Sequence, residues 1–195
     1  MKQLKTIVLV SVAAAILSAF AAKDNSYKVD AEKSKITWVG KKVTGQHNGT
    51  IQLAEGAFTM KGKKIASGSF AIDMTTLKDN DANARLETHL KSDDFFSTEK
   101  FPKATFVTSK IESKGGDQYL VKGDLTIKGI TNAIEFPATI VIANGTINAK
   151  ANIVVDRTKF DIKFRSGNFF ENLGDKAIED NFELGVELVG SQAAL

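Results

Sequence analysis

The stretch Tyr119–Lys128, with the sequence YLVKGDLTIK, decides the fold class. Its odd-numbered positions are apolar or glycine from Tyr119 to Ile127, whereas its even-numbered positions are mostly charged or polar. A period of two residues is typical of a strand with one buried face and one solvated face. The stretch therefore predicts a strand in a half-buried antiparallel sheet.

The same alternation returns on both sides of this stretch. It recurs in Phe70-Ile72-Met74, Ile134 to Ile142, Ile147 to Val155, Phe160-Ile162-Phe164 and Phe182 to Leu188. Glycine-containing turns separate these runs, and one of them, Asn144-Gly145, is a two-residue hairpin signal. Strands joined by tight turns run antiparallel. About eight strands with one apolar face predict a single mainly β domain, either a sandwich or a closed barrel, and closure would also remove exposed edges.

One segment has helical spacing instead. Between Asp79 and Lys91 the apolar residues Ala82, Leu86 and Leu90 fall four positions apart, which predicts a short amphipathic helix. Asp79, Asn80 or Asp81 would be its N-cap. An aromatic loop follows, with Phe95, Phe96 and Phe101-Pro102. Helix and loop are expected to form either a lid over one barrel end or an ordinary crossover.

The N-terminus predicts export. Lys2 and Lys5 precede an apolar run from Ile7 to Phe20, and Ala19-Phe20-Ala21 fits a cleavage site. We expect residues 1–21 to be a removed signal peptide, residues 22–195 to be the barrel domain, and the product to be periplasmic or secreted. The alternative is an uncleaved anchor helix, although the run is shorter than the roughly 20 residues that span a bilayer.

Composition narrows the function classes. The chain has no cysteine, which excludes disulfides, thiolate metal sites and a lipid-anchoring cysteine. Without residues 1–21 it would keep 24 basic and 23 acidic residues, scattered along the chain. Nucleic-acid binding needs a concentrated basic face, so we do not expect it.

The residues available for catalysis are few. His47 and His89 are the only histidines, and neither lies in a metal-binding or catalytic motif. They could meet at a carboxylate to hold a metal, or act as acid and base, but such residues more often form polar caps. We assign no catalytic residue, no metal and no cofactor, and an enzyme is the least favoured interpretation.

Arg157 marks a change of register. The apolar positions up to Val155 are odd-numbered, whereas those from Phe160 are even-numbered, so a bulge or turn is expected between them. Arg157 would then lie at a bend or barrel mouth. There it could pair with a carboxylate such as Asp156 or Asp73, or contact an anionic lipid head group.

The interior of the barrel could hold a ligand. Small inward positions, Gly123, Ala138, Ala149 and Ala151, would leave volume, unless neighbouring aromatic rings and the helix fill it. The residues expected to line the lumen and its mouth are Trp38, His47, Phe70, Ile72, Met74, Leu86, His89, Leu90, Phe95, Phe96, Phe106, Leu125, Ile127, Phe136, Ala138, Ala151, Ile153, Arg157 and Phe160.

Several motifs together resemble those of the YceI-like family. They are SKITW at 34–38, HLKSDDFF at 89–96, KFPKATF at 100–106, GDLTIKGIT at 123–131 and DRTKF at 156–160. The resemblance implies an exported, lipocalin-like antiparallel barrel that holds a polyisoprenoid chain in its lumen. The chain departs from the family at Lys159-Phe160-Asp161-Ile162, where many members have "D-F-G-I", and at the loop Phe169–Asp175. Both departures bear on which head group the mouth accepts.

The first hypothesis is therefore a binding protein for an isoprenoid or quinone-like lipid, with a carrier or sequestering role that the resemblance links to stress. A structural or surface-interaction barrel with a packed interior is the alternative. The expected partner is a hydrophobic small molecule. Transient contact with a membrane surface is a further expectation, and the oligomeric state is left open, a homodimer included.

Overall fold

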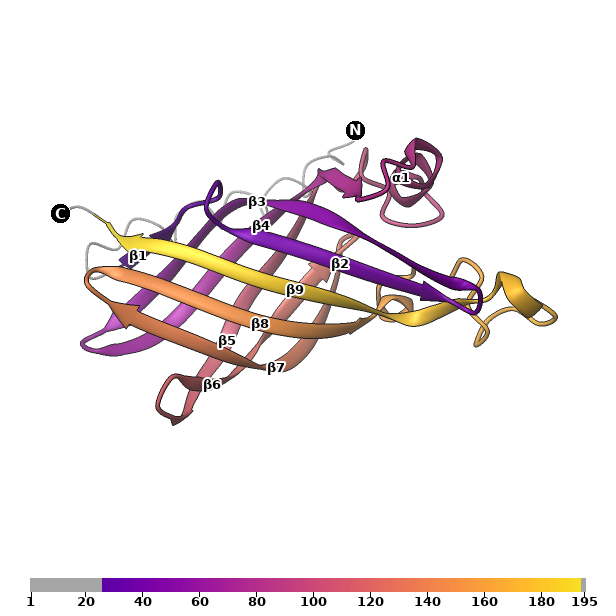
Figure 1. Cartoon of the computed structure of the whole chain (residues 1–195). Helices are drawn as coiled ribbons and strands as arrows, with labels where there is room; N and C mark the ends of the chain where they lie inside the picture. Colours follow the sequence, from indigo (N-terminus) through magenta and orange to yellow (C-terminus); the bar gives the residue numbers. More distant parts are fainter. Residues whose placement is uncertain (1–25, 194–195) are drawn as a thin grey trace, which may run out of the picture.

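The computed structural model describes residues 26–193, which form one antiparallel β-barrel with a short helix outside one end (Figure 1). Residues 1–21, the predicted signal peptide, lie outside the described part of the chain. The strands are β1 (Ser26–Val29), β2 (Lys35–Lys42), β3 (Gly45–Lys61), β4 (Lys64–Asp79), β5 (Lys103–Gly115), β6 (Gln118–Ile127), β7 (Ile130–Ala143), β8 (Thr146–Asp156) and β9 (Ile178–Gln192). The helices are α1 (Ala84–Lys91) and two short 3₁₀ helices, η2 (Arg157–Phe160) and η3 (Gly174–Lys176).

The barrel closes between its first and last long strands. Each strand from β2 to β9 pairs with the next, and β9 pairs back onto β2, where Trp38 lies opposite Leu184. The short β1 also lies between β3 and β9, so β1 and β2 are two parts of one interrupted strand. The result is a closed barrel of eight strand positions, which confirms the predicted fold class and decides for a barrel over a sandwich.

Tight turns join consecutive strands because their residues accept a left-handed backbone. Asn144 and Gly145 have φ values of 51° and 72°, and Lys128 and Gly129 have 53° and 74°. Two successive residues with positive φ form the turn whose twist matches that of the flanking strands. The hairpin predicted at Asn144-Gly145 is therefore confirmed.

Four phenylalanine rings, Phe58, Phe70, Phe106 and Phe136, form a row across the lumen away from the end that α1 covers. Phe58 meets Phe70 with 5.1 Å between ring centroids, and Phe106 meets Phe136 at 5.4 Å. The sequence predicts that Gly123 leaves free volume in the lumen, and this prediction is wrong. A Cβ atom there would lie 2.6 Å from the ring of Phe106, so the glycine gives its space to that ring.

The helix begins later than predicted. β4 continues to Asp79, which pairs with Gly49 of β3, and Ala82 has a left-handed φ of 54° that a helix excludes. The N-cap is Asn83, whose side chain accepts a hydrogen bond from the backbone N–H of Leu86 at 3.1 Å. Sequence spacing placed the cap at residues 79–81 because it could not show how far the β3–β4 ladder extends.

Across residues 26–193, the structure has no helix of the length and hydrophobicity that a membrane crossing requires.

Candidate functional site

The barrel lumen contains two adjacent apolar cavities. The mouth cavity has a volume of about 180 Å³ and lies at the end covered by α1 and the aromatic loop. The distal cavity has a volume of about 110 Å³ and lies deeper, beside the row of phenylalanine rings. Ile72, Leu125 and Leu184 line both cavities. For scale, an engineered apolar cavity of about 150 Å³ admits benzene.

Most residues predicted for the lumen line one of these cavities. The mouth cavity is lined by Trp38, His47, Ile72, Met74, Leu86, Leu90, Phe95, Phe96, Leu125, Ile127 and Arg157 from the predicted set. The distal cavity is lined by Phe70, Phe106, Phe136, Ala138, Ala151 and Ile153 from that set. Sequence alternation placed these side chains on the inner face, and barrel closure gathered them.

Two predicted residues, His89 and Phe160, do not line either cavity. The imidazole of His89 packs edge-on against Phe95 and Phe164, with centroid distances of 5.0 and 4.7 Å, and its Nε2 lies 3.2 Å from Asp94 Oδ2. Phe160 is 1% exposed and belongs to the packed core under η2. His89 therefore packs α1 against the aromatic loop and Phe164, and Phe160 is part of the core next to the mouth.

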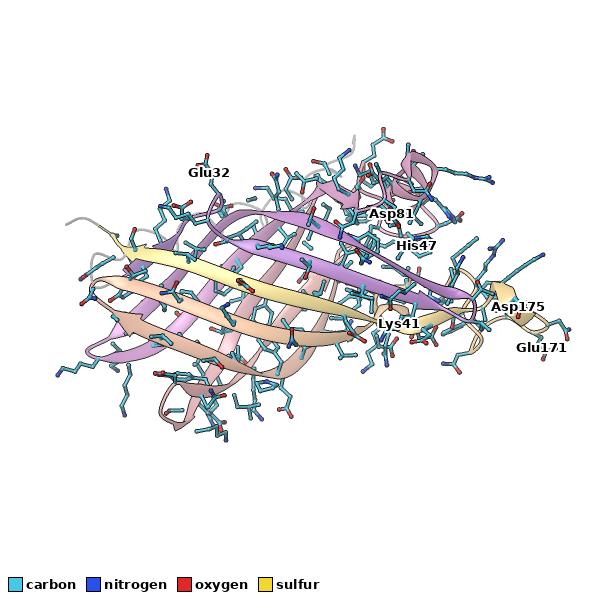
Figure 2. The ribbon with its side chains drawn as sticks, in the orientation of Figure 1. Glu32, Lys41, His47, Asp81, Glu171 and Asp175 are labelled. Atoms are coloured by element: carbon cyan, nitrogen blue, oxygen red, sulfur yellow. The ribbon has the colours of Figure 1, made fainter. Side chains whose placement is uncertain are left out.

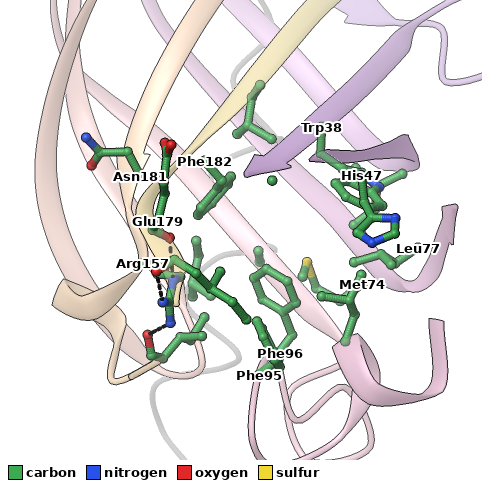
Figure 3. A pocket seen from close by; sticks show the side chains of 18 of the residues that line it. Trp38, His47, Met74, Leu77, Phe95, Phe96, Arg157, Glu179, Asn181 and Phe182 are labelled. Atoms are coloured by element: carbon green, nitrogen blue, oxygen red, sulfur yellow. Dashed lines mark hydrogen bonds between the residues drawn. The ribbon is translucent and has the colours of Figure 1, made fainter. Parts of the chain in front are cut away.

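The lid is held on the barrel by polar contacts around Glu87 of α1. Its carboxylate accepts a hydrogen bond from the backbone N–H of Asp79 at 3.1 Å and another from Lys78 Nζ at 3.0 Å. These contacts, led by the Asp79 N–H, lower the pKa of Glu87. With α1 anchored to the end of β4, Leu90 and the loop residues Phe95 and Phe96 line the mouth (Figure 3).

Arg157 also lines the mouth, across from His47 and Leu77 in Figure 3, and its guanidinium is hydrogen-bonded to the protein itself. Nε donates to Glu179 O at 2.9 Å, Nη1 to Ile162 O at 2.7 Å, and Nη2 to Ile178 O at 3.0 Å. Nη2 also lies 3.4 Å from Asp180 Oδ1. Burial lowers the pKa of Arg157, while the charge of Asp180 acts in the opposite direction.

These contacts correct the predicted partners of Arg157. The ion pair forms with Asp180 rather than with Asp73 or Asp156, because Asp156 caps η2 instead, accepting from the N–H of Thr158 at 2.9 Å. The register change at this point is confirmed, since β8 ends at Asp156 and η2 follows. Arg157 thus fastens η2 to the start of β9.

Sequence reasoning missed part of the mouth. Lys41, Lys42, Ile178, Glu179, Asn181 and Phe182 also line the mouth cavity. The alternation from Phe182 to Leu188 predicted which residues of β9 point into the barrel. Only the pairing of β9 with β2 shows that Leu184 lies opposite Trp38. Phe182 additionally meets the lid, with its ring edge-on to Phe96 at 6.3 Å.

The two histidines do not form the shared site considered from the sequence. His47 Nδ1 lies 3.9 Å from Asp79 Oδ1, whereas His89 is paired with Asp94. Among the described residues, the group of potential metal ligands contains His47, Asp79 and Asp81 without His89.

Comparisons with known proteins agree with the fold. The sequence profile described as the YceI-like domain matches residues 27–190. A UPF0312 protein of Photorhabdus laumondii is 27% identical over 189 residues, covering 94% of this chain and 96% of that protein. The crystal structure of Burkholderia cenocepacia BcnA superposes with a TM-score of 0.69 at 25% identity, covering 83% of this chain and 98% of that one. A polyisoprenoid-binding domain from Saccharophagus degradans superposes with a TM-score of 0.67 at 14% identity, covering 87% and 100%.

Proposed function

Because the chain belongs to the YceI-like domain family, we propose that its barrel holds the chain of an isoprenoid-type lipid, polyprenyl or quinone-like, in the lumen. The observation that carries the proposal is the pair of adjacent apolar cavities inside the barrel, which share Ile72, Leu125 and Leu184 as lining residues. The polyisoprenoid-binding domain of Saccharophagus degradans, which has the same fold, supports this choice of ligand. The role would be that of a carrier or sequestering protein without catalytic residues.

The lumen suggests an orientation for the lipid. The distal cavity is lined mainly by aliphatic and aromatic side chains, and its small residues Ala138 and Ala151 lie opposite each other on β7 and β8. Polar groups gather at the mouth, where Lys41, His47 and Glu179 line the wall. We therefore propose that the chain end enters the distal cavity and the head group stays at the mouth.

The energetics of an empty lumen favour an occupant. Unfilled apolar space costs about 24 cal/mol per Å³ in core truncation series. A mouth cavity of about 180 Å³ would then cost about 4 kcal/mol. An apolar ligand would offset that cost, whereas a barrel with a purely structural role would be expected to fill the space with side chains.

The test is to extract the purified protein with organic solvent and identify any lipid by mass spectrometry. Binding of an all-trans prenyl alcohol can be followed through the fluorescence of Trp38, the only tryptophan, which lines the mouth cavity. Ala138→Phe and Ala151→Phe should block the distal cavity and abolish uptake while the barrel stays folded.

Asn152→Phe is the matched control, because Asn152 is exposed on the same strand as Ala151 and points outward. It should bind like the wild type. Clean extracts together with no binding of any prenyl lipid would instead support the structural barrel.

We further propose that the protein is exported after loss of residues 1–21 and touches membranes transiently at the mouth end. Phe169 and Phe170 are each 50% exposed on the loop between η2 and η3, and Lys163 Nζ lies 5.0 Å from the ring centroid of Phe169. Exposed aromatic and basic side chains suit a lipid surface. Sedimentation with anionic lipid vesicles should therefore weaken in the double variant Phe169→Ser, Phe170→Ser, and unchanged sedimentation would contradict the contact.

A further inference from the structure

We propose that His47, Asp79 and Asp81 form a binding site for a divalent transition-metal ion of the zinc type at the rim of the barrel. One potential ligand atom from each of the three side chains lies within 4.8 Å of the other two. Figure 2 shows His47 and Asp81 together at the junction between the barrel and the helical lid. His47 comes from β3, Asp79 ends β4, and Asp81 follows in the connection to α1.

Asp79 provides the strongest observation. Its side chain is completely buried, yet its Oδ1 atom has no hydrogen-bond partner. The other oxygen, Oδ2, accepts from the backbone N–H groups of Asp81 and Asn83, both at 3.2 Å. A buried carboxylate oxygen without a partner loses its hydration without a compensating interaction, which destabilises the fold. The carboxylate is therefore fixed through Oδ2, while Oδ1 is left facing His47.

The atom facing this oxygen is also unpartnered. His47 Nδ1 is buried without a hydrogen bond and lies 3.9 Å from Asp79 Oδ1. This separation is too long for a hydrogen bond, whose N···O distance is about 2.7–3.2 Å. A cation bound between His47 Nδ1 and Asp79 Oδ1 would give both of these unpartnered atoms an interaction.

The donor set indicates the class of ion. One imidazole nitrogen and two carboxylates suit zinc and neighbouring transition metals, whereas calcium and magnesium prefer oxygen ligands alone. Zinc–ligand bonds of about 2.0–2.1 Å in tetrahedral geometry place donor atoms about 3.3 Å apart. The gap of 3.9 Å between His47 and Asp79 therefore needs only a small contraction, and exposed Asp81 is free to turn inward.

An ion held here would join the lid to the barrel. Asn80, between the two aspartates, is already tied to β3, because its N–H donates to Asn48 O at 2.9 Å. Asp81 and the N-cap Asn83 lead directly into α1. Metal binding would therefore restrain the segment that carries Leu86 and Leu90 over the mouth cavity.

The experiment titrates chelator-treated protein with Zn²⁺ by calorimetry, with Mg²⁺ and Ca²⁺ in parallel. We expect one Zn²⁺ per chain, no measurable binding of the other two ions, and a higher melting temperature with Zn²⁺. His47→Ala and Asp81→Asn should each weaken Zn²⁺ binding at least tenfold. Both residues are partly or fully exposed, so these variants should fold.

His89→Ala is the matched control, because His89 also lies beside a carboxylate, Asp94, but outside the cluster. It should bind Zn²⁺ like the wild type. NMR of the imidazole groups gives an independent signal, since Zn²⁺ should shift the resonances of His47 and leave those of His89 in place. Equal Zn²⁺ affinity in the His47 and His89 variants, or no saturable binding to the wild type, would overturn the site.

Discussion

Arg157 is the only buried cationic side chain within residues 26–193, and its guanidinium binds backbone more than it binds charge. Three carbonyl groups and Asp180 accept its hydrogen bonds. The carbonyls of Ile178 and Glu179 lie at the start of β9, and that of Ile162 follows η2. A single residue therefore replaces the ladder hydrogen bonds that are lost where the sheet ends.

Replacement of Arg157 by methionine should lower the free energy of unfolding by about 3–5 kcal/mol, because three backbone carbonyls would lose a charged hydrogen-bond donor. Asp180, which is 18% exposed, would lose its cationic partner and keep only its hydrogen bond from Asn168. Urea denaturation followed by circular dichroism measures this loss. Lys150→Met is the control, since it removes an ion pair with Glu187 in which both side chains are more than half exposed. That change should cost less than about 1 kcal/mol. Equal losses in the two variants would show that Arg157 has no special role.

At the level of elements, α1 is docked by the apolar side chains of Leu86 and Leu90 and by one carboxylate, that of Glu87. Glu87 receives the backbone N–H of Asp79 and the ammonium of Lys78, and these contacts lower its pKa below the ordinary value of 4.5. A carboxyl group whose pKa is lowered by folding stabilises the folded state at pH values above its unfolded pKa. That contribution disappears as the pH falls below 4.5 and through the lower folded value.

Glu87→Gln should therefore be less stable than the wild type at pH 6, and the difference should shrink as the pH falls from 4.5 towards 3. Urea denaturation across this range measures it. Glu171→Gln is the control, because Glu171 is exposed on the η2–η3 loop and should give no comparable pH-dependent difference. A constant gap between wild type and Glu87→Gln at every pH would contradict the role given to this charge.

At the level of the whole molecule, barrel closure brings the two ends of the described chain together. Tyr27 of β1 pairs with Gln192 of β9, and the N–H of Ala193 donates to Ser26 O at 2.8 Å. The closing β2–β9 pair joins residues far apart in sequence, such as Trp38 and Leu184. A protein with such distant pairing folds more slowly than a helical protein, because the chain loses conformational entropy in closing long loops before the stabilising contacts form.

A circular permutant that joins residue 193 to residue 26 by a short linker and opens at Asn144-Gly145 should therefore fold into the same barrel. The new ends would lie in a tight exposed turn, where no ladder hydrogen bond is cut. The far-ultraviolet circular dichroism spectrum and a cooperative urea transition test this. A second permutant, opened between Asn148 and Ala149 inside β8, should fail to fold. The opposite outcome would show that closure does not organise the barrel.

Much of the fold could be predicted from the sequence, but less of the site. Most of the alternating strands and the turn at Asn144-Gly145 were predicted correctly, and most lumen residues line a cavity. The strand predicted at Phe160-Ile162-Phe164 was wrong, because η2 ends at Phe160 and irregular backbone follows in place of a strand. The helix start at Ala84 was missed because it depends on where β4 leaves β3. His89 was predicted to line the lumen, but its ring packs against Phe95 and Phe164 outside the cavities. The reason is that neighbouring residues of a helix, such as His89 and Leu90, point to different faces.

The sequence by itself determined the antiparallel, half-buried sheet and the apolar inner face of most strands. These properties follow from period-two alternation and turn preferences, which act between residues close in the chain. Only the tertiary structure decided that Leu184 lies opposite Trp38, that Asp180 pairs with Arg157, and that Asp79 faces His47. It also decided that Gly123 is filled by Phe106 while Ala138 and Ala151 border free space. Such features depend on which strands close the barrel and on how side-chain volumes fill it, and local sequence patterns do not encode either.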